Sequence, residues 1–325
     1  MGRLYGERPA MAFAFIFPGQ GSQFVGMGKA LSEAFPSARN VFERVDSALD
    51  QSLSDLMWTG SEEDLTLTSN TQPALMACSL AAMAALEEEF GVKVTDAKYV
   101  AGHSLGEYSA LAAAGSLSIE DTAKLLRIRG NAMQSAVPVG AGAMAALLGA
   151  SVEDAEAACL AGSQHGIVQI ANDNATGQIV LSGEVAAVEA AAQAARDAGV
   201  KKAMMLNVSA PFHCAMMKPA ADAMEVALAE ATILPPLVPV INNIQARPIE
   251  NADDLREDLV KQVTGRVRWR ESIEWMAAEG GIDIFAEPGC GKVLTVMLRR
   301  IIKGPSGHKL DTPEALEAFA KEIKG

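Results

Sequence analysis

The sequence has little of what would place it in several large classes of protein. Its four cysteines, Cys78, Cys159, Cys214 and Cys290, form no C-x-x-C pair, which argues against a zinc site or a disulfide framework and favours a reducing compartment. It has no run of about 18 uninterrupted apolar residues, and its first ten residues carry no apolar core of a signal peptide. We therefore expect a cytoplasmic protein with no bound metal and no membrane partner.

Basic residues are also scarce relative to acidic ones. The chain has 27 lysines and arginines against 40 aspartates and glutamates, for a formal net charge of −13. Proteins that bind nucleic acids need basic surface to displace counterions, so this balance argues against such a partner. What the chain does have is 325 residues, 50% of them hydrophobic, which can bury the core of one large domain or of a domain with an insert.

Short apolar strands alternate with alanine-rich helical stretches in the two outer parts of the chain. We expect strands at residues 12–17, 98–101 and 282–287 and helices at residues 72–90, from the cap at Ser118 to about Ala136, and near Val293. This alternation is typical of a mostly parallel sheet covered by helices. The prediction is an α/β-hydrolase-like domain made of residues 1–138 and 210–325.

The middle of the chain has the order β-α-β-β-α-β, which is typical of a small ferredoxin-like unit. Its strands are expected at residues 143–148, 166–170, 178–182 and 201–208, and its helices at residues 151–161 and 184–198. The turn-forming residues 172–177 predict a loop between the two central strands. Gly140 and Pro211 mark the ends of this unit, so we predict an inserted ferredoxin-like subdomain at residues 139–209.

The stretch Gly102-His-Ser-Leu-Gly106 fits G-x-S-x-G, in which a serine lies on a sharp strand-to-helix turn. Ser104 is thus a candidate nucleophile, and a serine needs a base to act as one. Of the four histidines, His103 is on the same turn and should point away, His165 is in a polar turn, and His308 is in a tail expected to be mobile surface. His213 is the remaining candidate. No acid stands out as its orienting partner, so an esterase and an acyltransferase both stay open at this point.

Residues 17–23, FPGQGSQ, form a glycine-rich turn after the first expected strand. The turn lacks the third glycine of G-x-G-x-x-G, and Gly28-Lys29 is followed by Ala30 instead of the serine or threonine of a nucleotide-binding P-loop. A turn at a strand end can instead present a backbone N–H to an oxyanion.

Taken together, FPGQGSQ, GHSLGEY, RIRGNAMQ at Arg127–Gln134 and SAPFH at Ser209–His213 resemble the malonyl-CoA:acyl-carrier-protein transacylase family. The resemblance extends from Phe17 to about Arg300 and includes ANDNATGQIVLSG and EPGCGKVL. It implies that Ser104 is the nucleophile and His213 the general base, with the backbone N–H groups of Gln20 and Leu105 holding the oxyanion.

The resemblance also implies a neutral group supporting the histidine, which falls on Gln262 in the stretch LVKQ. The sequence alone equally allows an ordinary polar residue at a helix end. For Arg129, the sequence alone favours a solvated surface charge, whereas the resemblance implies that it grips the free carboxylate of malonyl. A guanidinium can do so through two parallel hydrogen bonds. The SAPFH context is more like malonyl-selective than methylmalonyl-selective members.

The implied partners are malonyl-CoA and an acidic acyl carrier protein, bound transiently by a monomeric enzyme that needs no cofactor. Because the enzyme is acidic too, a local basic patch must steer the encounter. The candidates are Lys201-Lys202, the cluster Arg266, Arg268 and Arg270, and Arg299-Arg300 with Lys303. The alternatives are a stand-alone acyltransferase of a polyketide synthase, a serine thioesterase or esterase, and a non-catalytic acyl-binding protein. The tail after Lys303 has no assignable role.

Overall fold

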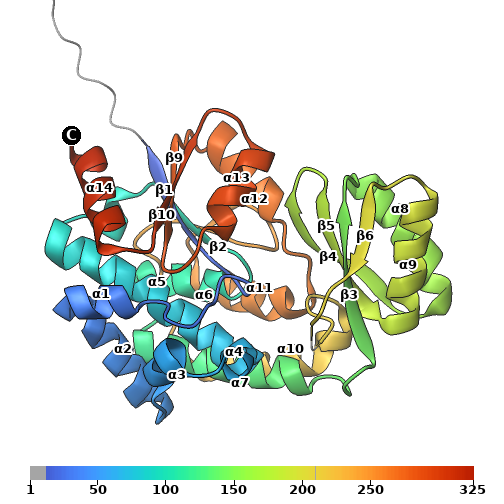
Figure 1. Cartoon of the computed structure of the whole chain (residues 1–325), viewed down its shortest axis with the longest axis horizontal. Coiled ribbons are helices and arrows are strands. Elements are labelled where there is room, and N and C mark those ends of the chain that lie inside the picture. Colours follow the sequence, from blue (N-terminus) through green and yellow to red (C-terminus); the bar gives the residue numbers. More distant parts are fainter. Residues whose placement is uncertain (1–11, 209) are drawn as a thin grey trace, which may run out of the picture.

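The structure, a computed structural model, describes residues 12–208 and 210–325. The expectation about a signal peptide concerns the first ten residues, which lie outside the described ones, as does Ser209 at the expected end of the insert. Figure 1 shows two parts side by side, a larger one built on a six-stranded sheet and a smaller one built on a four-stranded sheet. The predicted α/β fold with an inserted subdomain is confirmed, while the boundaries at residues 139 and 209 stay a prediction. In the described ranges, no helix has the length and apolar character to cross a membrane.

The larger sheet has the strand order β10-β9-β1-β2-β7-β8. All neighbours are parallel except β7 and β8, which are antiparallel. Its strands are β1 (Phe13–Phe17), β2 (Tyr99–Gly102), β7 (Val240–Ile241), β8 (Pro248–Ile249), β9 (Ile284–Pro288) and β10 (Ser306–Leu310). Parallel β1 and β2 end together, with Phe17 opposite Gly102. The turns after these two strands, FPGQGSQ and GHSLGEY, therefore meet at one edge of the sheet.

Strand β1 is buried on both faces, which explains its continuous apolar run. Phe13, Phe15 and Phe17 pack into the main core, while Ala14 and Ile16 face a second core on the other side. The second core is covered by α12 (Trp269–Ala278) and α13 (Val293–Ile301). The main core is covered by α1 (Lys29–Ala34), α2 (Pro36–Leu49), α3 (Leu53–Thr59), α4 (Glu62–Thr66), α5 (Thr68–Phe90), α6 (Gly106–Ala113), α7 (Ile119–Ser135), α10 (Lys218–Glu230), α11 (Ala252–Thr264) and α14 (Pro313–Lys324).

The tail of the chain differs from the expected mobile surface, and that expectation was wrong. Residues 306–310 form β10, which extends the larger sheet beyond β9. Leu310 is fully buried, and the ring of His308 packs against Phe319 of α14 with centroids 5.8 Å apart. Apolar residues of α14 thus bind the tail to the sheet.

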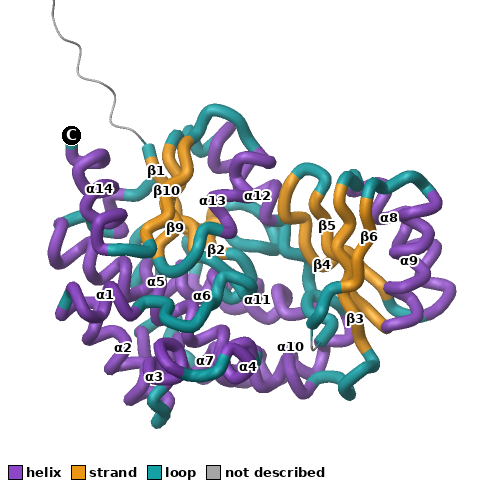
Figure 2. Tube along the Cα trace, viewed as in Figure 1, coloured by secondary structure: helices purple, strands orange, loops and turns teal. Residues whose placement is uncertain are grey.

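The smaller sheet has four antiparallel strands in the order β4-β5-β3-β6, and Figure 2 shows these strands beside the helices that cover them. The elements are β3 (Gly142–Leu148), α8 (Val152–Gly162), β4 (Val168–Ala175), β5 (Gln178–Glu184), α9 (Val185–Asp197) and β6 (Lys202–Met205). This is the predicted β-α-β-β-α-β order. Alanines of α8 and α9 pack on Leu147, Ile179 and Leu181 to form a separate core.

The loop expected at residues 172–177 was wrong, because β4 continues to Ala175 and leaves a turn at Thr176-Gly177. Irregular pairing with β5 accommodates these polar residues. The other side of β4 is paired with the larger part of the molecule: Asp173 N–H donates to Val267 O at 2.9 Å, and Val267 N–H donates to Ala171 O at 2.8 Å. This seam, residues 171–174 with residues 266–270, also holds the buried carboxylate of Asp173 at 3.1 Å from Arg266 and 2.8 Å from Arg270.

Candidate active site

The turn around Ser104 is a nucleophile elbow in which both glycines are required. A Cβ on Gly102 would lie 1.9 Å from the backbone of Gly106, and a Cβ on Gly106 would lie 2.2 Å from Phe17 O. Ser104 has a φ of 54°, the left-handed region, and its N–H donates to Asn243 Oδ1 at 2.7 Å. The elbow therefore exposes the hydroxyl beyond the end of β2, as the motif predicts.

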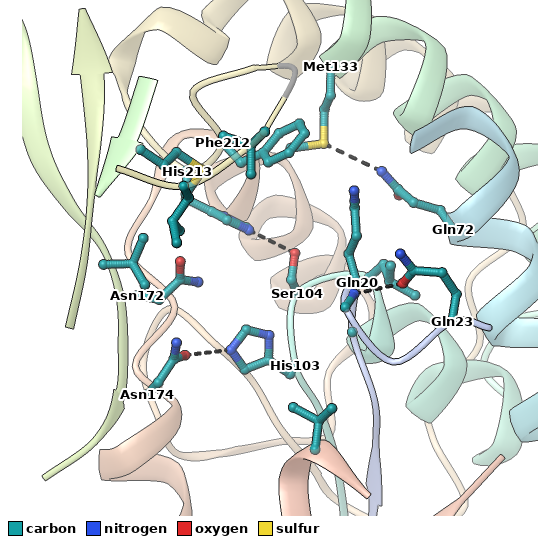
Figure 3. A pocket seen from close by; sticks show the side chains of 18 of the residues that line it. Gln20, Gln23, Gln72, His103, Ser104, Met133, Asn172, Asn174, Phe212 and His213 are labelled. Carbon is teal, nitrogen blue, oxygen red and sulfur yellow. Dashed lines mark hydrogen bonds between the residues drawn. The ribbon is translucent and has the colours of Figure 1, made fainter. Parts of the chain in front are cut away.

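The hydroxyl of Ser104 lies 2.7 Å from Nε2 of His213, and a dashed line marks this hydrogen bond in Figure 3. On the other side of the ring, Nδ1 is 2.9 Å from the backbone oxygen of Gln262. That carbonyl can only accept, so Nδ1 carries the proton and Nε2 is free to accept from Ser104. Burial, together with the positive charge of Arg129, lowers the pKa of His213 to about 3. The imidazole is therefore neutral, which is the form that a general base needs.

Arg129 is fully buried at 1% exposure, so the surface position that the sequence alone favoured was wrong. Its Nη1 donates to Gln72 Oε1 at 2.8 Å, and its Nη2 donates to Gln262 Oε1 at 2.8 Å and to Ser104 Oγ at 3.2 Å. Desolvation lowers the pKa of this guanidinium, but an arginine stays charged at neutral pH. Its partners are thus neutral oxygens, and the Ser104 hydroxyl is one of them.

The pocket over Ser104 lies between the two parts of the molecule. The larger part contributes the FPGQGSQ turn, the elbow, α7 and α13, and the smaller part contributes β4 and the segment after β6. The strand expected at residues 201–208 ends at Met205, and residues 206–208 line the pocket instead. The residues that line it include Gln20, Gln72, Leu105, Phe212 and Met297.

Gln20 and Leu105 both line this pocket, Gln20 after β1 and Leu105 directly after Ser104. Within residues 12–208 and 210–325, neither backbone N–H donates to another protein group. The side chain of Gln20 reaches Thr68 Oγ1 at 3.4 Å. Two backbone donors near Ser104 are thus available for a negatively charged oxygen.

The ring of His103 points away from Ser104 and toward the smaller part, where its Nε2 lies 2.7 Å from Asn174 Oδ1 (Figure 3). The ring also packs edge-on against Trp269, with centroids 5.5 Å apart. His165 lies in a short turn, and His308 lies in β10, so neither joins the pocket.

Three residues of the site were missed from the sequence: Gln72, Glu107 and Asn243. Gln72 follows the first turn of α5, and Glu107 is in the first turn of α6. Burial raises the pKa of Glu107 to about 7, against the lowering effect of its bonds from Gln262 and Asn243. The sequence did contain a signal for Glu107. The helix that follows an elbow serine must pack on the sheet, so an acidic residue three positions after that serine can be expected to be buried.

The three basic clusters differ in their surroundings. Arg266 and Arg270 pair with the buried Asp173, and Arg268 pairs with Glu271, so this cluster is held in internal ion pairs. Arg299 and Arg300 are exposed at the end of α13, whose Val293 and Met297 line the pocket. Lys201 and Lys202 are exposed at the start of β6, before the residues that reach the pocket.

An elbow serine paired with a neutral, buried histidine beneath two free backbone donors defines an acyl-transferring serine enzyme by its geometry. The family model described as "Acyl transferase domain" matches residues 14–309. The chain therefore belongs to the acyl transferase domain family, and the resemblance inferred from the sequence motifs is confirmed.

Among its relatives, the chain is similar to the malonyl CoA-acyl carrier protein transacylase of Bacillus subtilis (strain 168), with 43% identity over 312 residues that cover 96% of this chain and 97% of that protein. The crystal structure of an acyl-carrier-protein-S-malonyltransferase from Bartonella henselae matches with a TM-score of 0.94 and 52% identity, covering 97% of this chain and 100% of that one. A malonyl-transacylase solved in complex with a type II PKS acyl-carrier protein matches with a TM-score of 0.92 and 40% identity, covering 96% and 99%.

Proposed function

We propose that this protein transfers the malonyl group of malonyl-CoA to the phosphopantetheine thiol of an acyl carrier protein, through a malonyl ester on Ser104, for fatty-acid biosynthesis. The observation that carries the proposal is the buried, charged Arg129 with Nη2 at 3.2 Å from the Ser104 hydroxyl. An esterase needs the serine and the histidine but has no use for a buried cation beside them. The names of the relatives agree with this substrate.

In the first half-reaction, Arg129 binds the free carboxylate of malonyl-CoA. His213 Nε2 takes the proton of Ser104 Oγ as the oxygen attacks the thioester carbon. The N–H groups of Gln20 and Leu105 stabilise the oxyanion of the tetrahedral intermediate. His213 then protonates the departing CoA thiolate, and malonyl stays on Ser104 as an oxyester.

In the second half-reaction, the phosphopantetheine thiol of the carrier protein enters where CoA left. His213 accepts its proton, the thiolate attacks the ester, and Ser104 recovers the proton as it leaves. Each step uses protein groups and two thiols, so the scheme requires no metal and no redox cofactor. The Gln262 carbonyl holds the proton on Nδ1 throughout, which keeps Nε2 as the reacting nitrogen.

Arg129 supports selection of malonyl over acetyl. A hydrogen bond to a charged group contributes about 1.5–3 kcal/mol, or roughly 10- to 150-fold. Acetyl lacks the carboxylate and leaves the guanidinium with neutral partners alone. Phe212 lines the same pocket. Its bulky ring leaves less room for a branched acyl group, which favours malonyl.

For the carrier protein, we infer that the docking surface is the exposed basic side of α13, formed by Arg299 and Arg300 with Lys303. Val293 and Met297 of the same helix line the pocket. An acidic partner bound to this surface would therefore lie beside the entrance to the pocket over Ser104. Arg300 also reaches Gln178 of the smaller part at 3.3 Å. Because the cluster of Arg266, Arg268 and Arg270 is engaged in ion pairs, it is the weakest of the three candidates.

A carrier protein of a polyketide synthase is the second candidate, favoured by the likeness to the transacylase solved with a PKS carrier protein. Either carrier would bring the same phosphopantetheine thiol to Ser104. A monomeric state and a cytoplasmic location, where CoA thioesters and carrier proteins would meet the enzyme, belong to the same proposal.

Intact mass of the purified protein after brief exposure to malonyl-CoA tests the proposal, with Ser104→Ala as the matched control. We expect one malonyl adduct on the wild type, none on the control, and discharge of the adduct by added holo acyl carrier protein. Free malonate without an adduct would point to a hydrolase. If neither an adduct nor free malonate forms, malonyl-CoA is excluded as the substrate.

A further inference from the structure

Glu107 is a fully buried acid that the proposed mechanism does not use. It lies three residues after the nucleophile and is 1% exposed. Its Oε2 accepts two hydrogen bonds, from the backbone N–H of Asn243 at 3.1 Å and from Gln262 Nε2 at 2.7 Å. Burying a carboxyl group costs desolvation free energy that such hydrogen bonds offset only if their donors are held in place. Glu107 and its two donors are therefore parts of one hydrogen-bonded unit.

The bond from Gln262 fixes which end of that side-chain amide faces the pocket. Nε2 donates to Glu107 Oε2 and, at 3.0 Å, to the backbone oxygen of Ser104. Both groups are acceptors here, so the amide nitrogen must lie on their side. The amide oxygen is then directed at Arg129, where it accepts from Nη2 at 2.8 Å. In the reversed orientation, the NH₂ group would meet a guanidinium that can only donate.

The amide oxygens of Gln72 and Gln262 each hold one Nη nitrogen of Arg129. Together they fix the plane in which the guanidinium presents its donors. His213 depends on Gln262 in a different way, because it bonds to the backbone oxygen, which does not move when the side-chain amide turns. A change at Glu107 should therefore reach Arg129 while leaving the Ser104–His213 pair in place.

We propose that Glu107 is a positioning residue for malonyl selectivity: it fixes the Gln262 carboxamide, which in turn holds Arg129 in the orientation that receives the substrate carboxylate. This inference rests on the proposed function. It assigns to the glutamate of GHSLGEY an effect on the choice of acyl group and none on the attack itself.

The test compares Glu107→Leu, which removes the acceptor, with Glu107→Gln, whose amide oxygen can replace Oε2. For Glu107→Leu, we expect kcat/KM with malonyl-CoA to fall roughly 10- to 100-fold, mainly through KM, because Arg129 loses its alignment. With acetyl-CoA, the change should stay within about twofold, since acetyl makes no use of Arg129. Glu107→Gln should restore malonyl transfer to within about threefold of the wild type.

A double-mutant cycle separates positioning from general damage. In an Arg129→Ala background, Glu107→Leu should have no further effect on malonyl transfer, because the two residues act in series. The proposal is overturned if Glu107→Leu lowers malonyl and acetyl transfer by the same factor, or if its full effect persists without Arg129. If Glu107→Leu does not fold, Glu107→Asp takes its place. The aspartate side chain is one methylene shorter, so it keeps the carboxyl group but moves the acceptor away from Gln262. The same malonyl-specific loss is expected.

Asp258→Asn is the matched control. Asp258 is also buried, is on the same helix as Gln262, and accepts from Asn242 Nδ2 at 2.7 Å and Gln245 Nε2 at 2.6 Å. It should lower thermal stability without changing the malonyl-to-acetyl ratio, and a ratio change as large as that of Glu107→Leu would count against a specific role for Glu107. Failure of the wild type to form a malonyl adduct would instead refute the proposed function itself.

Discussion

The two side chains proposed to react both belong to residues with left-handed backbone. Ser104 has a φ of 54° and His213 a φ of 57°, and neither is a glycine. This conformation costs on the order of 1–2 kcal/mol for each residue. Side-chain and backbone oxygens of Asn243 and Gln262 hold the two residues there. The surrounding structure thus maintains backbone strain at Ser104 and His213, the two residues whose geometry the proposed chemistry requires to be fixed.

At the same scale, the buried imidazole predicts an unusual pH dependence. With a pKa of about 3 for His213, the neutral form predominates above about pH 4. Therefore kcat/KM for acylation by malonyl-CoA should not fall tenfold per pH unit as the pH is lowered from 6.5 to 5, as it would with an ordinary histidine. Burial raises the pKa of Glu107 to about 7, so this carboxyl becomes protonated as the pH falls, but its Oε2 can accept in either form and we expect at most a shift between two plateaus.

A stopped-flow acylation series in buffers from about pH 5 to pH 8 checks this expectation. A continuous fall with a slope of one per pH unit below 6.5 would show that His213 titrates normally in the free enzyme. Circular dichroism at each pH is the control, because it reports unfolding separately from titration of the base.

At the scale of elements, the elbow depends on the contact between α6 and the end of β1. Gly106→Ala would place a Cβ 2.2 Å from Phe17 O, and backbone cannot move aside as a flexible side chain can. We expect a loss of several kcal/mol in the free energy of unfolding, at the upper end for single substitutions, together with loss of the malonyl adduct.

Urea unfolding of Gly106→Ala beside Gly140→Ala measures this effect. A Cβ at Gly140 would meet nothing within 4 Å, although its φ is 83°, so that control should cost only about 1–2 kcal/mol. Equal losses in the two variants would show that close packing at the elbow is not the cause.

At the scale of the whole molecule, the seam at Asp173 fixes the smaller part over Ser104. Asp173 is buried and pairs with Arg266 and Arg270, which are partly exposed. Asp173→Asn would put a neutral amide beside both arginines and leave Arg270 with Glu274 as its remaining charged partner. Because solvent screens the arginines, we expect a loss of about 1–3 kcal/mol in the free energy of unfolding, below the range for a fully buried pair.

Glu274→Gln is the matched control, since Glu274 also pairs with Arg270 but is 42% exposed. An exposed pair contributes about 0–1 kcal/mol, so this variant should be nearly neutral. Urea unfolding measures the free energy of unfolding of both variants. If the seam keeps water out of the pocket, intact-mass assays should also show faster hydrolysis of the malonyl adduct in Asp173→Asn. Equal stabilities for the two variants would contradict the seam's role.

The sequence by itself determined what depends on short spacing. The glycines and serine of GHSLG dictate the elbow because sterics over five residues allow little else, and the β-α-β-β-α-β order of the insert follows from local periodicity. The tail strand β10 and the extension of β4 to Ala175 escaped prediction because both depend on hydrogen bonds to other strands: β10 pairs with β9, and β4 beyond Ile170 pairs with β5 on one side and with Val267 on the other. Strand pairing overrode the turn-forming residues there.

Only the tertiary structure decided which polar residues surround the serine. Arg127 and Arg129 are two positions apart on α7, yet Arg127 bonds to Asn70 and Gln51 while Arg129 is buried beside Ser104. Gln262 of α11 shares hydrogen bonds with His213, Arg129, Glu107 and the backbone oxygen of Ser104, which lie 49 to 158 residues away in the sequence. Burial and hydrogen-bond partners arise from packing across the whole chain, so local sequence cannot specify them.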